Sequence, residues 1–342
     1  MTRETNLMLR TPLSISEALS YAITLCLQPI ISLLGIFLNV CCIVSFVPAF
    51  TQHQQYYRKT SLLIYLIAMS VCNSIQLSLS VFVIVLPAVE QFIDEQRFPS
   101  TYQGLLDFNK SIVYFSYPLL MSANYASIWI LTLICAQRYQ SICHPSSSWK
   151  RRLQIVRKSK FCVAFVVVLA LVFNFPRYWE LKLNESNSTT LRESFVYKFV
   201  QEGIIYGCIV YGLPMGFLLW LNLNTIRIVK TENDQSRRPA EHRTALMTIT
   251  VFVLFFFCTT LSVTLRLILI FGGTMLGSVE NVYFVDISNL LANLQAFSMP
   301  VVCFIYTRAF RDLFFVVRFV PTKSQNDEGL LEETHQLDAE AI

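Results

Sequence analysis

The chain has 342 residues, of which 54% are hydrophobic and only 14% charged, and its formal net charge is +5. Soluble domains average about 25% charged residues, so this composition excludes an ordinary soluble protein. Long stretches carry no charge, while Lys and Arg gather in the short segments between them. That distribution is typical of an integral membrane protein.

The chain begins with a polar segment. Arg3, Glu4 and Arg10 lie near the start, so the apolar core of a cleaved signal peptide is not expected there. We expect residues 1–19 to form an extracellular N-terminal segment.

Seven apolar stretches follow this segment. A helix needs roughly 20 predominantly apolar residues to cross the hydrocarbon core of a bilayer. The stretches are long and lack period-two alternation, which favours helices over the strands of an outer-membrane barrel. The fourth is the shortest, because Lys160 and Arg177 bound it. The expected spans are about residues 20–47, 60–88, 109–137, 160–180, 200–227, 243–271 and 282–306.

The loops between the expected spans differ in charge. The third loop holds six basic residues and no acid between Lys150 and Lys160, and the first and fifth loops are also basic. The second loop, between Glu90 and Asp107, is acidic. The positive-inside rule therefore predicts a plasma-membrane protein with an extracellular N-terminus and a cytoplasmic C-terminus. The N-glycosylation sequons all fall on the outer side in this topology: Asn109, Asn184 and Asn187.

The residues after the last span change in character twice. Phe310, Arg311 and Leu313 predict an amphipathic helix on the inner leaflet, acting either as a membrane anchor or in signalling. The six acids after Pro321 predict a disordered cytoplasmic tail over residues 321–342. The expected fold is an all-α membrane protein, a seven-transmembrane helix bundle over residues 20–320 that includes this short juxtamembrane helix.

The cysteines and histidines argue against other classes of protein. All ten cysteines lie in an expected span or beside its inner end, so no disulfide between outer loops is expected. All four histidines lie in loops or the tail, and no nucleophile–base set, metal-ligand spacing or cofactor motif is evident. Internal repeats and broken spans, which a transporter would need, are also not evident. We expect neither an enzyme nor a nucleic-acid partner.

Two span endings resemble a known receptor family. The third span ends in Gln137–Tyr139 (Gln-Arg-Tyr) followed by His144–Pro145, which resembles the acid-Arg-Tyr segment and His-Pro turn of rhodopsin-like G-protein-coupled receptors. The fourth closes with Asn174–Glu180 (Asn-Phe-Pro-Arg-Tyr-Trp-Glu), which resembles the closure of invertebrate FMRFamide-type peptide receptors, including those of nematodes. The order and spacing of such motifs extend the resemblance over about residues 20–320.

The resemblance implies roles for several polar and proline residues. Arg138 would contact a heterotrimeric G protein when the sixth helix moves outward, with simple anchoring at the interface as the alternative. Asn39 should face the bundle and pair with Asn73, either as a helix–helix hydrogen bond or as part of a switch. Pro300 can kink the seventh span. The predicted coupling and switch residues are Asn39, Asn73, Gln137, Arg138, Tyr139 and Pro300.

The sequence departs from the family pattern at several of its switch positions. Asn73 stands where the second span of the family has the acid that helps hold a sodium ion, so sodium control is not expected. Gln137 replaces the acid before the arginine, which is compatible with higher basal activity. Leu261 replaces the kink proline of the sixth span. Met299–Cys303 replaces the Asn-Pro-x-x-Tyr motif, so Tyr306 is not the motif tyrosine.

Two ionisable residues lie in apolar helix near the outer face: Arg266 in the sixth span and Asp286 in the seventh. A charge at mid-membrane costs about 2.5–3.5 kcal/mol, so both should face a cavity or each other. Asp286 could pair with the arginine of an amidated peptide or form an interhelical ion pair with Arg266. Outer aromatic residues could line a pocket or pack within the bundle. The predicted ligand-binding residues are Arg266, Asp286, Tyr117, Tyr206 and Tyr283.

The leading hypothesis from sequence is a G-protein-coupled receptor that binds an extracellular ligand, a neuropeptide of the FMRFamide type, and shifts between two states of the bundle. One alternative is a chemosensory receptor for environmental small molecules. Another is a receptor-like protein that has lost signalling. The expected partners are the lipid bilayer, the extracellular peptide or small molecule, and a heterotrimeric G protein.

Overall fold

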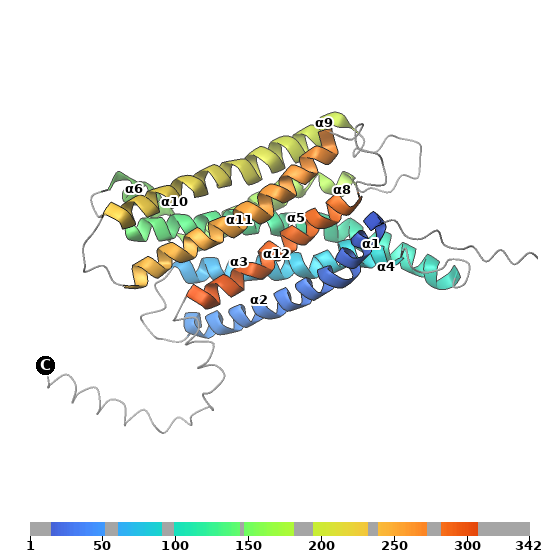
Figure 1. The fold of residues 1–342 in the computed structure, drawn as a ribbon, viewed down its shortest axis with the longest axis horizontal. Helices are drawn as coiled ribbons and strands as arrows, with labels where there is room; N and C mark the ends of the chain where they lie inside the picture. The colour runs from blue at the N-terminus through green and yellow to red at the C-terminus, as the bar shows by residue number, and fades with distance from the viewer. Residues whose placement is uncertain are drawn as a thin grey trace, which may run out of the picture.

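The computed structural model describes residues 15–51, 61–90, 99–143, 147–180, 194–231, 239–271 and 282–306. In this part of the chain, seven helices are long and apolar enough to cross a membrane, which confirms the predicted number of spans. They lie side by side along one axis. The first span begins at one end of the bundle, and the last span finishes at the other end (Figure 1). The spans are Ala18–Phe46, Ser61–Glu90, Gln103–Ile142, Ser159–Trp179, Phe195–Ile228, Leu246–Leu265 and Phe284–Tyr306.

The first two spans are each assembled from helical segments that continue through a π-helical turn. The first comprises α1 (Ile15–Tyr21), η1 (Ala22–Leu27) and α2 (Gln28–Thr51). The second comprises α3 (Ser61–Ser80), η2 (Val81–Val85) and α4 (Leu86–Glu90).

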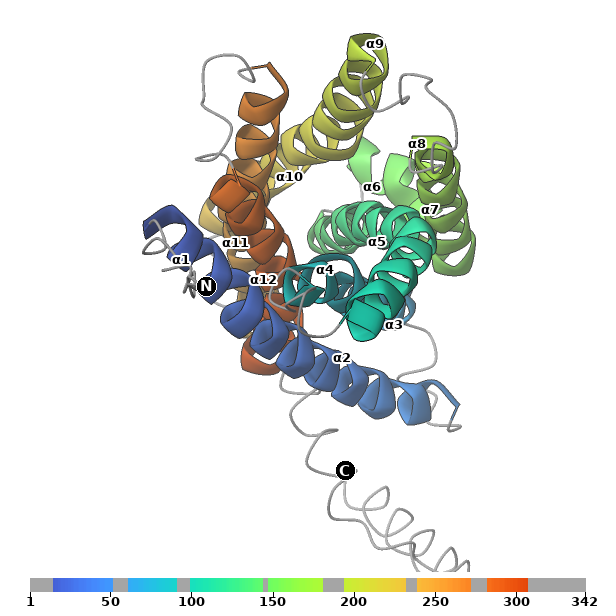
Figure 2. The ribbon, with the colours of Figure 1, turned by 90° about the vertical axis from the view of Figure 1, so that its right-hand side faces the viewer.

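The third span is the centre of the bundle. Its helix α5 (Pro99–Ile142) is 44 residues long, and 72% of its most apolar stretch is buried, the largest share among the seven spans. Viewed end-on, α5 has neighbours on several sides (Figure 2). The helix begins ten residues before the predicted start at residue 109, because Asp107 and Lys110 are exposed at the outer end, where water can solvate charges.

The basic third loop folds against the end of the bundle at which the last span finishes (Figure 1). It contains α6 (Ser148–Arg152) and a 3₁₀ turn, η3 (Leu153–Arg157). Helix α7 (Ser159–Asn174) then crosses back, and α8 (Arg177–Glu180) follows a turn at Phe175 and Pro176. A proline cannot supply the backbone N–H that a continuing helix needs, which explains the break.

The last three spans complete the bundle. The fifth is built from α9 (Phe195–Lys198), the π-helical η5 (Phe199–Gly212) and α10 (Leu213–Thr231). The sixth is α11 (Pro239–Phe271) and the seventh is α12 (Val282–Tyr306).

Pro300 lies inside α12 and explains how the seventh span is tied to the first. Its ring removes the hydrogen bond that the carbonyl of Ala296, four residues earlier, would normally accept. Asn39 of α2 donates its amide N–H to that carbonyl at 3.2 Å and to the Gly35 carbonyl at 2.8 Å. The predicted Asn39–Asn73 hydrogen bond is wrong. The Asn39 amide nitrogen donates to these two backbone carbonyls, and within the described part of the chain neither the Asn39 Oδ1 atom nor the Asn73 Nδ2 atom has a hydrogen-bond partner.

Three parts of the sequence prediction fall outside the described residues. They are the juxtamembrane helix after Tyr306, the acidic tail over residues 321–342, and most of the N-terminal segment over residues 1–19. All three stay predictions.

Candidate ligand and coupling sites

A buried arginine organises the outer end of the bundle. The Arg177 side chain, at the start of α8, has no exposed surface. Its Nη2 atom lies 2.6 Å from Oε1 of Glu202 in η5. Its Nε atom donates to the Asn174 side chain at 2.9 Å. Its Nη1 atom donates to the Tyr117 hydroxyl at 2.7 Å, and Nη2 also donates to the Tyr125 hydroxyl at 3.2 Å. We call these five residues the Arg177 hub.

The hub joins three spans that the sequence alone does not connect. Tyr117 and Tyr125 come from α5, Asn174 from the end of α7, and Glu202 from η5. A buried guanidinium is tolerated only when its N–H groups are satisfied and its charge is compensated. Both conditions are met here, so the hub links the third, fourth and fifth spans to one another.

In the sequence, Arg177 only bounds the apolar stretch of the fourth span, and no partner is predicted for it. In the structure it follows the turn at Phe175 and Pro176, and its side chain is fully buried. One sequence signal could have found the pairing. Glu202 is an acid within the outer half of an otherwise apolar expected span, and such an acid needs a basic partner.

Two of the predicted ligand-binding tyrosines belong to the hub or its surroundings. The Tyr117 hydroxyl accepts from Arg177, whose guanidinium also lies 5.3 Å from the Tyr117 ring centre. Tyr206 is buried and stacks on Tyr125 with ring centres 5.5 Å apart. Tyr206 is therefore a packing residue in this conformation. Tyr117 is half-buried, so part of its ring stays accessible.

Asp286 lies on the other side of the outer end, against the first span. Ser20 of α1 donates a hydrogen bond to its Oδ2 atom, and Thr24 of η1 also hydrogen bonds to the carboxylate. The residue is half-buried. The structure places the backbone of Arg266 in α11 and of Tyr283 in α12, but their side chains lie outside the described atoms. The Arg266–Asp286 ion pair stays a prediction.

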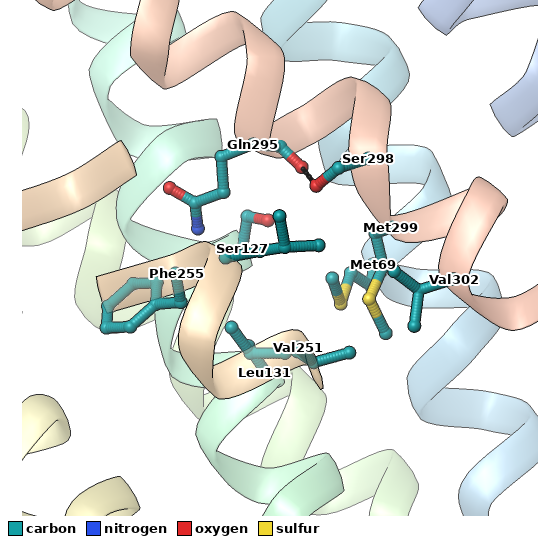
Figure 3. Close-up of a pocket in the computed structure, with 10 residues that line it drawn as sticks. Met69, Ser127, Leu131, Val251, Phe255, Gln295, Ser298, Met299 and Val302 are labelled. Atoms are coloured by element: carbon teal, nitrogen blue, oxygen red, sulfur yellow. Dashed lines mark hydrogen bonds between the residues drawn. The ribbon is translucent and has the colours of Figure 1, made fainter. Parts of the chain in front are cut away.

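A small cavity lies deeper in the bundle, between α3, α5, α11 and α12 (Figure 3). It leaves about 10 Å³ for the centre of a water molecule, enough for roughly one water and too little for a peptide side chain. Ser127 and Gln295 line it and are already engaged, by Asn73 at 2.6 Å and by Thr259 at 2.7 Å. No carboxylate is among the lining residues, so the donor set does not fit the family's sodium ion.

The inner end of α5 holds the predicted coupling residues. Gln137 donates its amide N–H to the Ser61 hydroxyl at 2.6 Å, which joins α5 to the start of α3. Arg138 is half-buried at the same end. Tyr139 is buried, with its ring centre 5.7 Å from that of Trp220 in α10. The neutral amide at position 137 therefore bonds to a neighbouring helix through a neutral hydroxyl.

Helices α11 and α12 are joined along their length by side-chain hydrogen bonds. Tyr306 forms one of these bonds, although it is not at the position of the tyrosine in the Asn-Pro-x-x-Tyr motif. α11 is a continuous helix without an interior proline, as the replacement of the kink proline by Leu261 predicts. An outward movement of its inner end would have to break the innermost bond. The pairs are Ser262 with Ser288 at 2.7 Å, Thr259 with Gln295 at 2.7 Å and Thr250 with Tyr306 at 3.0 Å.

The structure limits one of the predicted glycosylation sites. Asn109 is buried in α5, and its amide nitrogen lies 2.5 Å from Oε2 of Glu90. A glycan needs an exposed amide nitrogen, so this conformation does not present Asn109 as an acceptor. Asn184 and Asn187 lie outside the described residues and stay predictions.

Comparison with known proteins identifies the family. Residues 57–304 match the family described as 7 transmembrane receptor (rhodopsin family). The chain belongs to this family of receptors. It is 24% identical over 277 residues to an FMRFamide receptor of Drosophila melanogaster. The aligned region covers 76% of this chain and 48% of that protein. It is 26% identical over 171 residues to an FMRFamide peptide receptor of Caenorhabditis elegans. Here the aligned region covers 50% of this chain and 36% of that protein.

The family assignment confirms the resemblance drawn from the two span endings. The chain is a multi-pass membrane receptor of the rhodopsin family rather than an enzyme. The matched region covers less than half of the length of each of these two relatives.

Proposed function

We propose that this receptor sits in the plasma membrane with its N-terminus outside, binds an extracellular FMRFamide-type peptide and activates a heterotrimeric G protein. The observation that carries the peptide assignment is the half-buried Asp286 carboxylate at the outer end of α12. FMRFamide spells Phe-Met-Arg-Phe with an amidated C-terminus, so such a ligand offers an arginine and no terminal carboxylate.

The surroundings of Asp286 suit a cationic ligand. A carboxylate has about four lone-pair sites, and the hydroxyls of Ser20 and Thr24 satisfy part of them. The remaining sites can accept a bidentate guanidinium, which is the strongest geometry for this pair. The outer aromatic side chains, including the partly accessible Tyr117 ring, supply surfaces for the phenylalanines of such a peptide.

The coupling proposal rests on the retained Arg138 at the inner end of α5. In this conformation α11 is held to α12 by the Thr250–Tyr306 hydrogen bond. We propose that peptide binding shifts the population towards a state in which α11 has moved outward and Arg138 meets the G protein.

A chemosensory receptor for small molecules is the second candidate, because the switch positions of the family are altered at Asn73 and Gln137. Stimulating cells that express the receptor with matched peptides distinguishes the two. We expect Phe-Met-Arg-Phe-amide to elicit a response and the Arg-to-Glu analogue of the same peptide to elicit none. Equal responses to both peptides would refute the role of Asp286 in ligand recognition.

A further inference from the structure

The loop between the third and fourth spans forms a strongly basic surface beside the membrane. The exposed basic side chains lie on α6, on η3, at Lys158 between η3 and α7, and at the start of α7. No Asp or Glu occurs in the sequence between Asp107 and Glu180, so this stretch of the chain carries only positive charge. We call this surface the basic cluster: Arg151, Arg152, Arg157, Lys158 and Lys160.

The loop is held rigidly, so the basic cluster has a fixed position. Leu153 and Val156 are buried against the bundle, and the Tyr65 hydroxyl of α3 donates to the Val156 carbonyl at 2.7 Å. Lys150 is not part of the cluster, because its ammonium donates to the Cys143 carbonyl at 3.0 Å. The inward-facing residues therefore anchor the loop while the cluster faces outward.

Exposed apolar side chains continue the basic cluster along the membrane-facing side of α7. Phe161 is 63% exposed and Phe165 58%, and their rings stack with centres 6.5 Å apart. Ile155, within η3, is 57% exposed. The fourth span is the least buried of the seven, with 28% of its most apolar stretch covered by protein. A molecule with an anionic head and an apolar tail would satisfy both surfaces at once.

Trp149 marks the level of this surface. It is 38% exposed, its ring centre lies 4.5 Å from that of Trp220, and the Arg152 guanidinium lies 5.1 Å from the Trp149 ring centre. Tryptophan is enriched at the membrane–water interface, where its amphipathic ring sits among the lipid headgroups. In the proposed orientation, the basic cluster therefore lies at the level of the inner-leaflet headgroups.

We propose that the basic cluster and the Phe161–Phe165 stack together bind an anionic phospholipid of the inner leaflet, preferentially a phosphoinositide. Arg157, Lys158 and Lys160 contact the phosphates, and an acyl chain lies against the two phenylalanines. A phosphoinositide is favoured over phosphatidylserine because several closely spaced cations match several phosphates. The assignment to the inner leaflet rests on the proposed orientation, but the binding itself requires no peptide and no G protein.

The test uses the full-length receptor, purified in detergent and mixed with phosphatidylinositol bisphosphate, with bound lipid counted by native mass spectrometry. Each basic residue near the headgroups contributes strongly, so the triple variant R157Q/K158Q/K160Q is expected to bind at least about tenfold more weakly. The matched control R237Q/R238Q/R243Q removes the same charge from the fifth loop and should bind like the wild type. Equal losses in both variants would overturn the proposal, because they indicate diffuse attraction rather than a site.

Two further arms separate a lipid from the other possible occupants. Soluble inositol trisphosphate, which lacks the acyl chains, should compete at least about tenfold less well than the lipid, because it cannot use the apolar contact. Equal competition would overturn the role of the Phe161–Phe165 stack. A triple variant that keeps its lipid binding but loses peptide-stimulated G-protein activation would also overturn the proposal and assign the basic cluster to the G protein.

Discussion

Replacing Arg177 or Glu202 singly by methionine is expected to destabilise the receptor by about 3–5 kcal/mol, because each change leaves the opposite charge buried without its partner. Arg177 has no exposed surface and the Glu202 side chain is only 18% exposed, so water cannot replace the lost partner well. The double methionine variant should recover much of this loss, since it leaves neither charge behind. The coupling energy of this double-mutant cycle measures the ion pair within the hub.

Stability can be followed by heating the purified receptor with a thiol-reactive dye, because unfolding exposes buried free cysteines such as Cys42, Cys135 and Cys162. Arg157→Met is the matched control, since Arg157 is exposed and surface changes usually stay within about ±0.5 kcal/mol. Single variants that unfold at the control's temperature would show that the hub does not hold the three spans together. So would a double variant whose loss equals the sum of the singles.

Reversing the charge at the proposed peptide contact, by Asp286→Arg, should lower the potency of Phe-Met-Arg-Phe-amide by about a hundredfold or more. The change removes an attractive charged pair, in which the hydrogen bonds contribute about 1.5–3 kcal/mol, and adds repulsion between two guanidinium groups. Asp286→Asn, which keeps the side-chain shape and one oxygen that can accept from Ser20, should have a smaller effect in the same direction.

Asp107→Asn provides the control for this experiment, because Asp107 is an exposed acid at the outer end of α5. It should leave peptide potency within a few-fold of the wild type. The Arg266–Asp286 alternative makes a different prediction. If the two residues pair with each other, Arg266→Ala and Asp286→Asn should impair the receptor to a similar extent, and potency should depend little on whether the peptide carries an arginine.

The spans could be predicted from sequence because membrane insertion depends on properties that a window of residues carries by itself. Length and apolar composition determined the number of spans and most of their limits. The predicted third span starts at about residue 109, ten residues after the start of α5, because a helix can extend beyond the bilayer where water solvates charges such as that of Asp107. The apolar composition of a stretch therefore predicts where the chain enters the membrane, but not where the helix begins.

The candidate sites were harder to predict because they depend on which helix faces meet. The acid Glu202 in an apolar span signals that a basic partner is needed, but the identity of that partner depends on the turn at Pro176 and on contacts across three spans, which no local pattern contains. Asn39 was correctly expected to face the bundle, but its partner is a backbone carbonyl freed by Pro300 rather than Asn73. Every residue has a backbone carbonyl, so the sequence does not show which carbonyl accepts a hydrogen bond. Matching polar side chains with one another therefore could not identify the partner of Asn39.

The central claim, that this divergent receptor still couples to a G protein, is tested most directly by nucleotide exchange on purified heterotrimeric G protein. Wild-type receptor in lipid vesicles should accelerate exchange when Phe-Met-Arg-Phe-amide is added. Arg138→Ala should fold and bind the peptide equally well but give no acceleration, because the arginine at the inner end of α5 would no longer meet the G protein. Acceleration that persists at wild-type level in Arg138→Ala, or a wild-type receptor that binds the peptide without any acceleration, would contradict the account.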